Sequence, residues 1–394
     1  MSWSIPSVPP RQRPEAIKLH IWLPILVVIM GIGAAAVLLF WPQDRSTHTP
    51  KFWLLLVGAP ASVCAVLFGM ILTRWERKQV VADESEREAT RLASLWRAWA
   101  RHHLGAVRAV AFLPTIQTAE QLVAGEVAMP VNLQRSVGFY WGEKDKADIR
   151  RDRLLGLVVD RFADDLANVR SLEVVLILDG TSQAGAAQWK AESGRLLAEA
   201  LPGIACDIRV ADATSCVARL EANLGQDQMP AQLIVAAQIW ADAGENTFSE
   251  GGAAILLSPR TAGRSVSGAQ PEALAGRICR PMTSQSSAMA DDVSTMLNMQ
   301  VVPGSLQQVW SSGLNRACST AMLGALSTGG ADNPTVIQLE DALGVPGPVS
   351  GWMALALALE AARHGKTHQL VAWQESDAER VHLCVVAPVQ PGGA

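Results

Sequence analysis

Residues 339–365 have the sequence LEDALGVPGPVSGWMALALALEAARHG, in which a loop rich in Gly and Pro leads into a long apolar helix. Two functions are open for this loop. Backbone N–H groups at a helix N-terminus bind anions, so the loop between Leu343 and Gly351 can cradle a ligand. Glycine also lets a helix lie close to a sheet, because it has no side chain to hold the two apart, and we favour this packing role.

The sequence on both sides of this stretch alternates short apolar runs with helical segments, which predicts an α/β fold with buried strands covered by helices. The first half has predicted strands at residues 107–113, 172–178, 207–210, 232–237 and 253–257, with helices at 152–168, 184–201 and 215–224. The second half has predicted strands at 275–281, 308–311, 335–339, 369–373 and 382–387, with helices at 289–299, 315–326 and 352–363. The similar order of strands and helices in the two halves predicts a duplicated unit. The segment around residues 260–270, with Ser, Gly and Pro, is predicted to connect the two copies.

Two apolar runs near the N-terminus, residues 21–41 and 52–73, each reach the length of about 20 residues that a helix needs to cross a bilayer. A cleaved signal peptide is the alternative for the first run, but the run is long for one and a second run follows at once. Tryptophans mark the ends of the runs, as is typical of the headgroup level: Trp22, Trp41, Trp53 and Trp75. We therefore predict a transmembrane hairpin.

Basic residues beside the runs predict the orientation, because Lys and Arg resist translocation. Three precede the first run and three follow the second, against two in the connecting loop: Arg11, Arg13, Lys18, Arg74, Arg77, Lys78, Arg45 and Lys51. Both ends of the chain are therefore predicted to face the cytoplasm. The predicted organisation is a cytoplasmic segment (1–20), a first span (21–41), a short periplasmic loop (42–51), a second span (52–73), a juxtamembrane helix (74–104) and two α/β halves (105–260 and 261–390).

The net charge of −4 and the hydrophobic content of 49% are typical of a globular protein and give no basis for binding nucleic acid. The six cysteines form no CxxC pair and have no metal-like spacing with histidine, so we expect free thiols in a reducing cytoplasm and no metal site. In the juxtamembrane helix, which Gly105 is predicted to end, Leu92, Leu95, Trp96 and Trp99 share one face. That face either packs on the following domain or lies on the membrane surface.

Two segments resemble motifs of the β-ketoacyl synthases, within the thiolase-like superfamily. Residues 245–259, ENTFSEGGAAILLSP, are similar to the segment in which a Phe and a Glu-Gly-Ala-Ala turn lead into a strand. The stretch 339–365 resembles a later motif, a Lys, three residues, Gly-His, and small residues up to a Gly that starts a helix. In this register the family's Lys, Gly, His and helix-starting Gly correspond to Glu340, Gly344, Val345 and Gly351.

Two further segments extend the resemblance over most of the chain from Gly105 to Pro388. Residues 308–313, QVWSSG, resemble the strand end that carries the family's other His, and Ser312 occupies its position. Residues 212–220, DATSCVARL, are similar to the Asp-Thr-Ala-Cys elbow, with Ser215 in register with the nucleophile and Cys216 one residue later. The resemblance implies a thiolase-like fold of α-β-α-β-α layers in which both histidines are absent.

The missing groups matter for the chemistry that the resemblance implies. In a decarboxylating condensation a thiolate attacks an acyl thioester, while two imidazoles stabilise the enolate oxygen and assist loss of the carboxylate. Val345 has no donor, and Ser312 can donate one hydrogen bond but is no base near neutral pH. We therefore expect a pseudoenzyme that uses no cofactor. A remnant of the ligand pocket is expected at Glu250, Gly251, Gly344 and Gly351.

The candidate nucleophiles have structural alternatives. Cys216 at a helix start can have a lowered pKa beside exposed N–H groups, or it packs in a core, which we favour. Ser215 is favoured as an N-cap that accepts from free amide donors. His364 and His368 lie four residues apart with Gly365 between them, which predicts a helix end rather than a metal site.

Three functions remain open. We favour a non-catalytic adaptor or scaffold at the cytoplasmic face of a bacterial inner membrane, for example an accessory of a secretion system such as type VI secretion. The alternatives are a binder of acyl chains or of acyl-carrier protein, and an acyltransferase of altered mechanism that uses Cys216 or Ser215. The expected partners are the lipid bilayer and another protein, and the resemblance implies a homodimer through a strand of the first half.

Residues 115–148 break the alternation of strands and helices. They form either an ordered insertion or a mobile flap. Trp141 lies in this region beside charged residues, where it either contacts a partner or is buried in the domain.

Overall fold

The structure is a computed structural model of the chain. It describes residues 2–3, 5–6, 9, 11–42, 46–115, 131–142, 144–167, 169–259, 274–328, 334–374 and 379–389, with the backbone alone at residue 215. The contacts between these residues define two compact units. One is a helical unit, Ile5–Trp96, and the other is a globular unit made of Met1–Ser4 and Arg97–Ala394.

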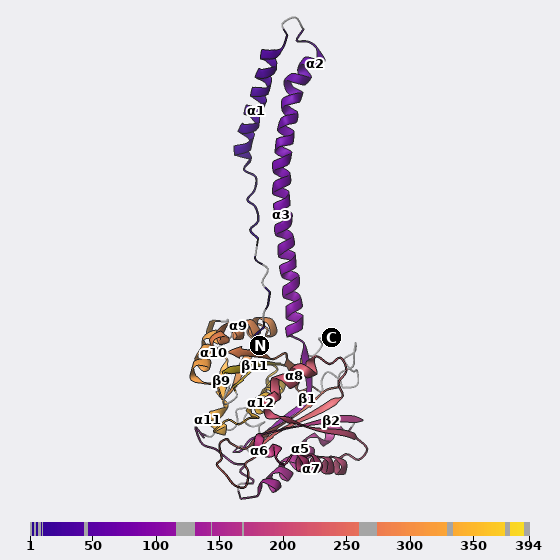
Figure 1. Cartoon of the computed structure of the whole chain (residues 1–394), viewed down its shortest axis with the longest axis vertical. Helices are drawn as coiled ribbons and strands as arrows, with labels where there is room; N and C mark the ends of the chain where they lie inside the picture. The colour runs from indigo at the N-terminus through magenta and orange to yellow at the C-terminus, as the bar shows by residue number, and fades with distance from the viewer. Residues whose placement is uncertain are drawn as a thin grey trace. The chain divides into compact units, whose positions relative to one another are not determined.

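The helical unit contains two long helices that coincide with the predicted apolar runs (Figure 1). Helix α1 covers Leu19–Phe40. The second helix starts as α2 (Pro50–Trp53), passes through a π-helical turn, η1 (Leu54–Gly58), and continues as α3 (Ala59–Ala100). By length and composition, both helices are able to cross a membrane.

The predicted juxtamembrane helix is not a separate element. Helix α3 continues from the apolar run to Ala100, because residues 70–100 contain no Gly or Pro that would interrupt it. The prediction that Gly105 ends this helix is wrong. Gly105 lies within strand β1 (His103–Phe112).

The first half of the globular unit pairs its strands in the order β3-β2-β4-β5-β1. Strands β3, β2 and β4 are parallel, and β5 runs antiparallel between β4 and β1. After β1 the elements are α5 (Ala147–Leu166), β2 (Ser171–Leu178), α6 (Gly180–Gln183), α7 (Ala186–Ala200), β3 (Ala205–Asp212), the 3-10 turn η2 (Ala213–Ser215), α8 (Cys216–Leu224), β4 (Ala231–Gln238) and β5 (Gly251–Leu257).

The second half repeats this arrangement in the order β9-β8-β10-β11-β6, with β9, β8 and β10 parallel and β11 antiparallel between β10 and β6. Its elements are β6 (Gly276–Cys279), β7 (Met282–Gln285), η4 (Ser286–Ala288), α9 (Met289–Gln300), β8 (Leu306–Ser312), α10 (Arg316–Thr328), β9 (Thr335–Gln338), α11 (Leu339–Leu343), α12 (Ser350–Gly365), β10 (His368–Gln374) and β11 (Arg380–Ala387). The first strands of the two halves, β1 and β6, pair antiparallel and join them. The predicted duplication is confirmed, and the predicted connection at residues 260–270 lies outside the described residues.

Three apolar clusters occupy the spaces between the layers of the globular unit. One packs α5 and α7 on the sheet of the first half, and another packs α9 and α10 on the sheet of the second half. The third and central cluster contains α8 and α12, which lie between the two sheets. The layers are therefore α-β-α-β-α, as predicted.

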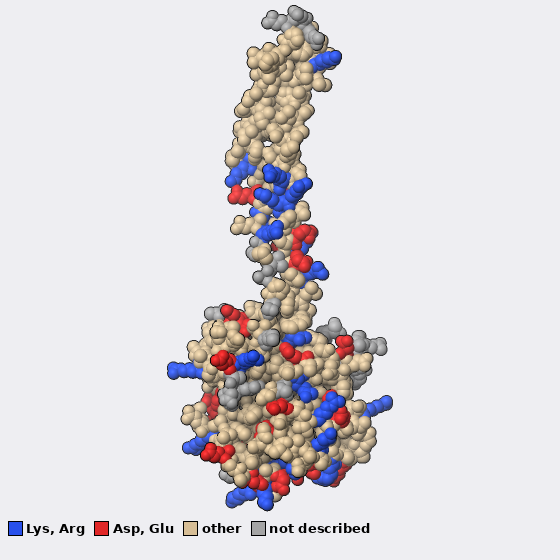
Figure 2. Space-filling model, in the orientation of Figure 1, with Lys and Arg blue, Asp and Glu red and all other residues tan. Residues whose placement is uncertain are grey.

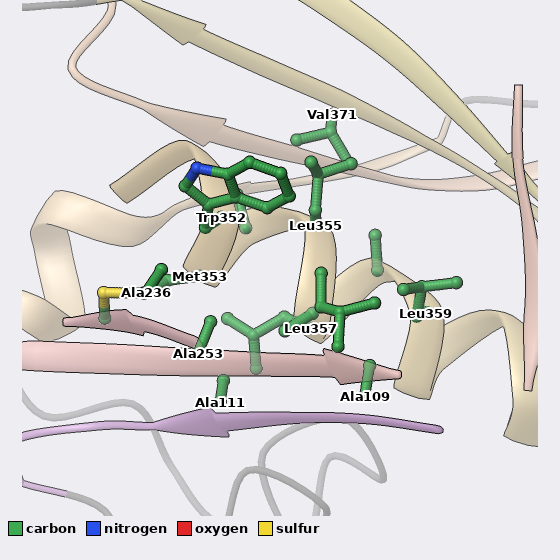
Figure 3. Packing of buried hydrophobic residues seen from close by; sticks show 14 of the residues in the cluster. Ala109, Ala111, Ala236, Ala253, Trp352, Met353, Leu355, Leu357, Leu359 and Val371 are labelled. Carbon is green, nitrogen blue, oxygen red and sulfur yellow. The ribbon is translucent and has the colours of Figure 1, made fainter. Parts of the chain in front are cut away.

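Helix α12 is the centre of this arrangement, and every residue from Ser350 to Ala362 is buried. Figure 3 shows Trp352 and Leu355 directed toward Val371 of β10, while Met353 and Leu357 point toward strands of the first half. Alanines on those strands make room for the helix: Ala109, Ala111, Ala236 and Ala253. A helix that contacts both sheets has no polar face, which explains its uniformly apolar sequence.

Candidate functional site

The structure brings together residues that the resemblance placed far apart in the sequence. Ser312 ends β8, Glu250 precedes β5, and Glu340, Gly344 and Val345 lie in and after α11. All of them line one pocket, together with Gln238, Ser249, Leu339, Leu343, Pro346, Gly347, Ser350 and Met353. The pocket has a volume of about 10 Å³, which is about the space that one water molecule requires.

Glycines allow the surrounding chain to fill this region closely. A Cβ atom at Gly251 would stand 2.6 Å from Cε of Met353, and one at Gly351 would stand 2.6 Å from Nε1 of Trp373. In the loop before α12, a Cβ at Gly347 would meet the side-chain amide of Gln238. These contacts support the packing role predicted for the glycines.

Gln238 connects the loop before α12 to the first half. Its Oε1 accepts from the backbone N–H of Val349 (2.9 Å), and its Nε2 donates to the carbonyl oxygen of Ser249 (2.6 Å). A donor at the start of α12 is therefore already bonded to a side chain of the protein, which argues against an anion cradle there.

Residues 131–142, which we call the cover, are hydrogen-bonded to residues that line the pocket and to their neighbours, although the pocket's lining itself comes from other segments. The carbonyl oxygen of Arg135 accepts from the N–H of Val345 (3.0 Å), and the Nδ2 of Asn132 donates to the carbonyl oxygen of Ala342 (2.7 Å). The N–H of Val137 donates to Oγ of Ser249 (3.1 Å). This part of the predicted insertion is thus an ordered segment fixed beside the pocket, whereas residues 116–130 and 143 lie outside the described residues.

Trp141, at the end of this cover, packs against the globular unit. Its ring stacks on that of Phe139 with centroids 4.4 Å apart, and the guanidinium of Arg153 lies 5.0 Å from the Trp141 ring. Phe139 is fully buried. Of the two alternatives for Trp141, these contacts support packing on the domain.

Glu250 and Arg150 form a buried ion pair beneath the cover. Glu250 is 0% exposed and Arg150 4%, and Nη1 of Arg150 donates to Oε1 of Glu250 at 2.5 Å. The N–H groups of Trp240 and Phe139 also donate to the carboxylate, each at 2.9 Å. Sequence reasoning missed Arg150. The signal was its place on the buried stripe of α5, four residues before Leu154, where a charge requires a partner.

Glu340, which stands in the place of the family's Lys, connects α11 to the loop after β8. Its Oε1 accepts from the N–H of Gly313 (2.7 Å), while its buried Oε2 has no hydrogen-bond partner among the described residues. Burial raises the pKa of this carboxyl above its ordinary value. The pocket thus presents the carboxyl groups of Glu340 and Glu250, the buried hydroxyl of Ser312 and the apolar side chain of Val345, and the described residues of its lining include no imidazole.

The remaining candidates lie elsewhere. Cys216 begins α8 and is 3% exposed within the central apolar cluster, and it does not line the pocket. Ser215 directly precedes α8, and its side chain lies outside the description. His368 starts β10, where its Nδ1 lies 2.8 Å from Oγ of Ser305, and His364 lies in the last turn of α12. Among the described residues, no group of His, Cys, Asp and Glu is placed to hold a metal ion.

We expect the substitution Glu340→Gln to change how stability depends on pH. Because the folded-state pKa of Glu340 is raised, its contribution to stability is present below the unfolded-state pKa and is lost as pH rises through the folded-state pKa. Glutamine keeps an acceptor for the N–H of Gly313 and carries no charge. In denaturant unfolding of the full chain in detergent, the parent should lose more stability from acidic to neutral pH than the variant. Parallel pH profiles would contradict this.

No family model matches the chain, and no curated protein matches it. Solved structures do match. The ketosynthase from module 1 of the bacillaene synthase of Bacillus amyloliquefaciens aligns with a TM-score of 0.50 and 9% identity, over 75% of this chain and 77% of its own. An oxazolomycin ketosynthase domain of Streptomyces albus has a TM-score of 0.46 and 13% identity, over 73% of this chain and 95% of its own. The ishigamide ketosynthase/chain length factor has a TM-score of 0.48 and 13% identity, over 73% of this chain and 99% of its own. At these identities the likeness concerns the fold and not the activity.

Proposed function

We propose that the chain is a non-catalytic adaptor or scaffold. Its globular unit has the thiolase-like fold of ketosynthases, and its N-terminal part contains two helices able to cross a membrane. Its two helices anchor it in a bacterial inner membrane, and its globular unit binds another protein at the cytoplasmic face. An accessory role in a secretion system, type VI included, is compatible with such an anchored binding domain.

The observation that carries the proposal is the composition and the small volume of the pocket. A condensing site needs a thiolate and groups that stabilise an enolate oxygen and assist loss of a carboxylate. At the corresponding positions stand Ser312, Val345 and Glu340, and the space between them is about 10 Å³. Ligand pockets for small molecules typically have volumes of about 300–1,000 Å³. Both the chemistry and the volume therefore favour a protein that binds through its surface.

The small volume of the pocket also disfavours the second candidate, a binder of acyl chains. An acyl chain would need far more space than about 10 Å³, and Val345 and Ser249 in the pocket wall are held in place by hydrogen bonds to residues 131–142. The third candidate, an acyltransferase, would need a reactive Cys216 or Ser215. The apolar surroundings of Cys216 favour a packing role for its thiol.

The predicted orientation and homodimer are part of the proposal. More basic residues flank the outer ends of the two apolar helices than lie in the loop between them, which favours cytoplasmic termini. Strand β3 is the edge of the sheet in the first half, and an edge strand is suited to pair with a second copy. Light scattering of the detergent-solubilised chain distinguishes a dimer from a monomer.

The test of the non-catalytic role is covalent labelling of the full chain by an electrophilic acyl-thioester mimic, followed by intact-mass measurement. The exposed thiol of Cys206 is first removed by Cys206→Ser, because it would react without any site. We expect no stoichiometric adduct, and equal, slow labelling when Cys216→Ala is added.

An adduct that forms stoichiometrically and disappears in Cys216→Ala would overturn the non-catalytic proposal and favour the acyltransferase. Iodoacetamide labelling of the parent at Cys206 provides the positive control for thiol integrity. The comparison thus separates a reactive site from a merely accessible thiol.

A further inference from the structure

Basic side chains gather at the start of α1 and at the end of the apolar part of α3. Lys18 immediately precedes α1, and Arg74 follows the apolar part of α3. We call this group the basic collar; it consists of Arg11, Arg13, Lys18, Arg74, Arg77 and Lys78. Figure 2 shows blue Lys and Arg side chains gathered where the long uncharged stretch of the helical unit ends, with red acidic side chains beside them.

Contacts within the helical unit bring the N-terminal segment that carries the first part of the collar against α3. The Nε1–H of Trp75 donates to the carbonyl oxygen of Glu15 (2.8 Å), which brings the segment before α1 against α3. Further along, Arg13 forms ion pairs with Glu86 (2.8 Å) and Asp83 (3.3 Å). The N-terminal segment therefore lies beside α3, and its cations add to those of the helix.

Charge is segregated along this part of α3. Within residues 11–20 and 71–80 the six basic residues of the collar face two acidic ones, Glu15 and Glu76. The following residues 83–91 reverse the balance, with Asp83, Glu84, Glu86 and Glu88 against Arg87 and Arg91. A positive zone thus directly adjoins the apolar helices, and a negative zone lies beyond it.

The cations of α3 in the collar are free to bind an external anion. Arg74, Arg77 and Lys78 have spacings of three and four residues, which place them on one face of the helix, and all three are exposed. None of them belongs to an ion pair between the described residues. By contrast, Arg87 and Arg91 are each paired with a Glu three residues earlier, Glu84 and Glu88.

From this arrangement we propose that the basic collar binds the phosphate headgroups of anionic phospholipids in preference to zwitterionic ones. Exposed cations beside a membrane-spanning segment meet the headgroup phosphates, and each contributes favourable energy near an anionic surface. The acidic zone at residues 83–88 is repelled by the same surface, so the charge boundary fixes how far α3 enters the headgroup layer. This inference rests on the membrane anchoring in the proposed function.

The test uses the full chain in detergent, incubated with equal amounts of phosphatidylglycerol and phosphatidylcholine and measured by native mass spectrometry. We expect several times more bound phosphatidylglycerol than phosphatidylcholine. The variant Arg74→Gln/Arg77→Gln should remove most of this preference, so that the two lipids bind in nearly equal amounts, because each basic side chain near an anionic surface contributes to it.

The matched control is Arg87→Gln/Arg91→Gln, which removes the same residue types and the same charge from the same helix. It should keep the preference, because these arginines are already paired with Glu84 and Glu88. Equal loss in both variants, or no preference in the parent, would overturn the inference. Displacement of the lipid by excess glycerol 3-phosphate would also overturn it, since the collar would then bind soluble phosphate.

Membrane anchoring is measured separately, as resistance of the chain to carbonate extraction from vesicles. A chain that resists extraction but shows no lipid preference contradicts the collar alone. A chain that is extracted contradicts the anchoring on which the proposed function depends.

Discussion

Replacing Arg150 with methionine is expected to lower the free energy of unfolding of the globular unit by about 3–5 kcal/mol. Methionine fills much of the space of the arginine side chain but leaves the carboxylate of Glu250 buried without its cation. The two backbone N–H groups that also donate to Glu250 are too few to replace the charge. Chemical denaturation of the full chain in detergent, followed by tryptophan fluorescence, measures the loss.

The matched control is Arg195→Met on α7. Arg195 is also paired with carboxylates, Glu192 and Glu199, but it is exposed, so its removal should change stability little. Adding Glu250→Gln to Arg150→Met should recover part of the loss, because it removes the unpaired charge. Equal effects of the Arg150 and Arg195 substitutions would refute the importance of burial.

Replacing Gly344 with alanine is expected to cost at least about 3 kcal/mol of stability. Gly344 has φ +80°, a conformation that strains any residue with a side chain. A Cβ atom there would stand 2.0 Å from the carbonyl oxygen of Arg135, so the cover would also have to move. The measurement is the unfolding midpoint of the full chain, together with protease sensitivity of residues 131–142 as a readout of the cover.

Gly156→Ala in α5 is the control for this substitution. Among the described residues, no atom beyond the adjoining residues and the backbone of the helix itself lies within 4 Å of a Cβ at Gly156. Alanine in a helix is more favourable than glycine, so stability should rise by up to about 1 kcal/mol. If Gly344→Ala were as well tolerated as Gly156→Ala, this result would contradict the close approach of Arg135 in the cover to Gly344.

The fold could be predicted largely from the sequence because its central strands, such as β4, β5 and β10, are buried on both faces. The apolar run at residues 172–178 stands out from its polar neighbours and corresponds to β2, Ser171–Leu178. Short elements were missed. Strand β7 has the sequence Met-Thr-Ser-Gln, which carries no apolar alternation, and it follows a Pro that interrupts the pattern. Helix α11, Leu339–Leu343, is too short for a helical period to appear in the sequence.

The candidate site was predicted in part. Register with the family motifs identified Ser312, Val345, Glu250 and Gly344, which the structure brings to one pocket from separate elements. It also identified Gly251 and Gly351, which pack against Met353 and Trp373 and do not line the pocket. The same register could not predict the cover, because its contacts join residues 131–142 to strands and loops far along the chain. Gln238 was missed for the same reason: a single polar residue at a strand end has no local pattern that identifies its partners.

The junction between helix α3 and strand β1 has a mechanical consequence. The helix ends at Ala100 and the strand begins at His103, so Arg101 and His102 alone separate them. The helix end is held by Gln300, whose Nε2 donates to the carbonyl oxygen of Ala100, and by Arg101, whose Nε donates to that of Met299, each at 2.8 Å. Strand β1 pairs with both β5 and β6, so a force applied to the last turn of α3, residues 97–100, acts on the seam between the two halves.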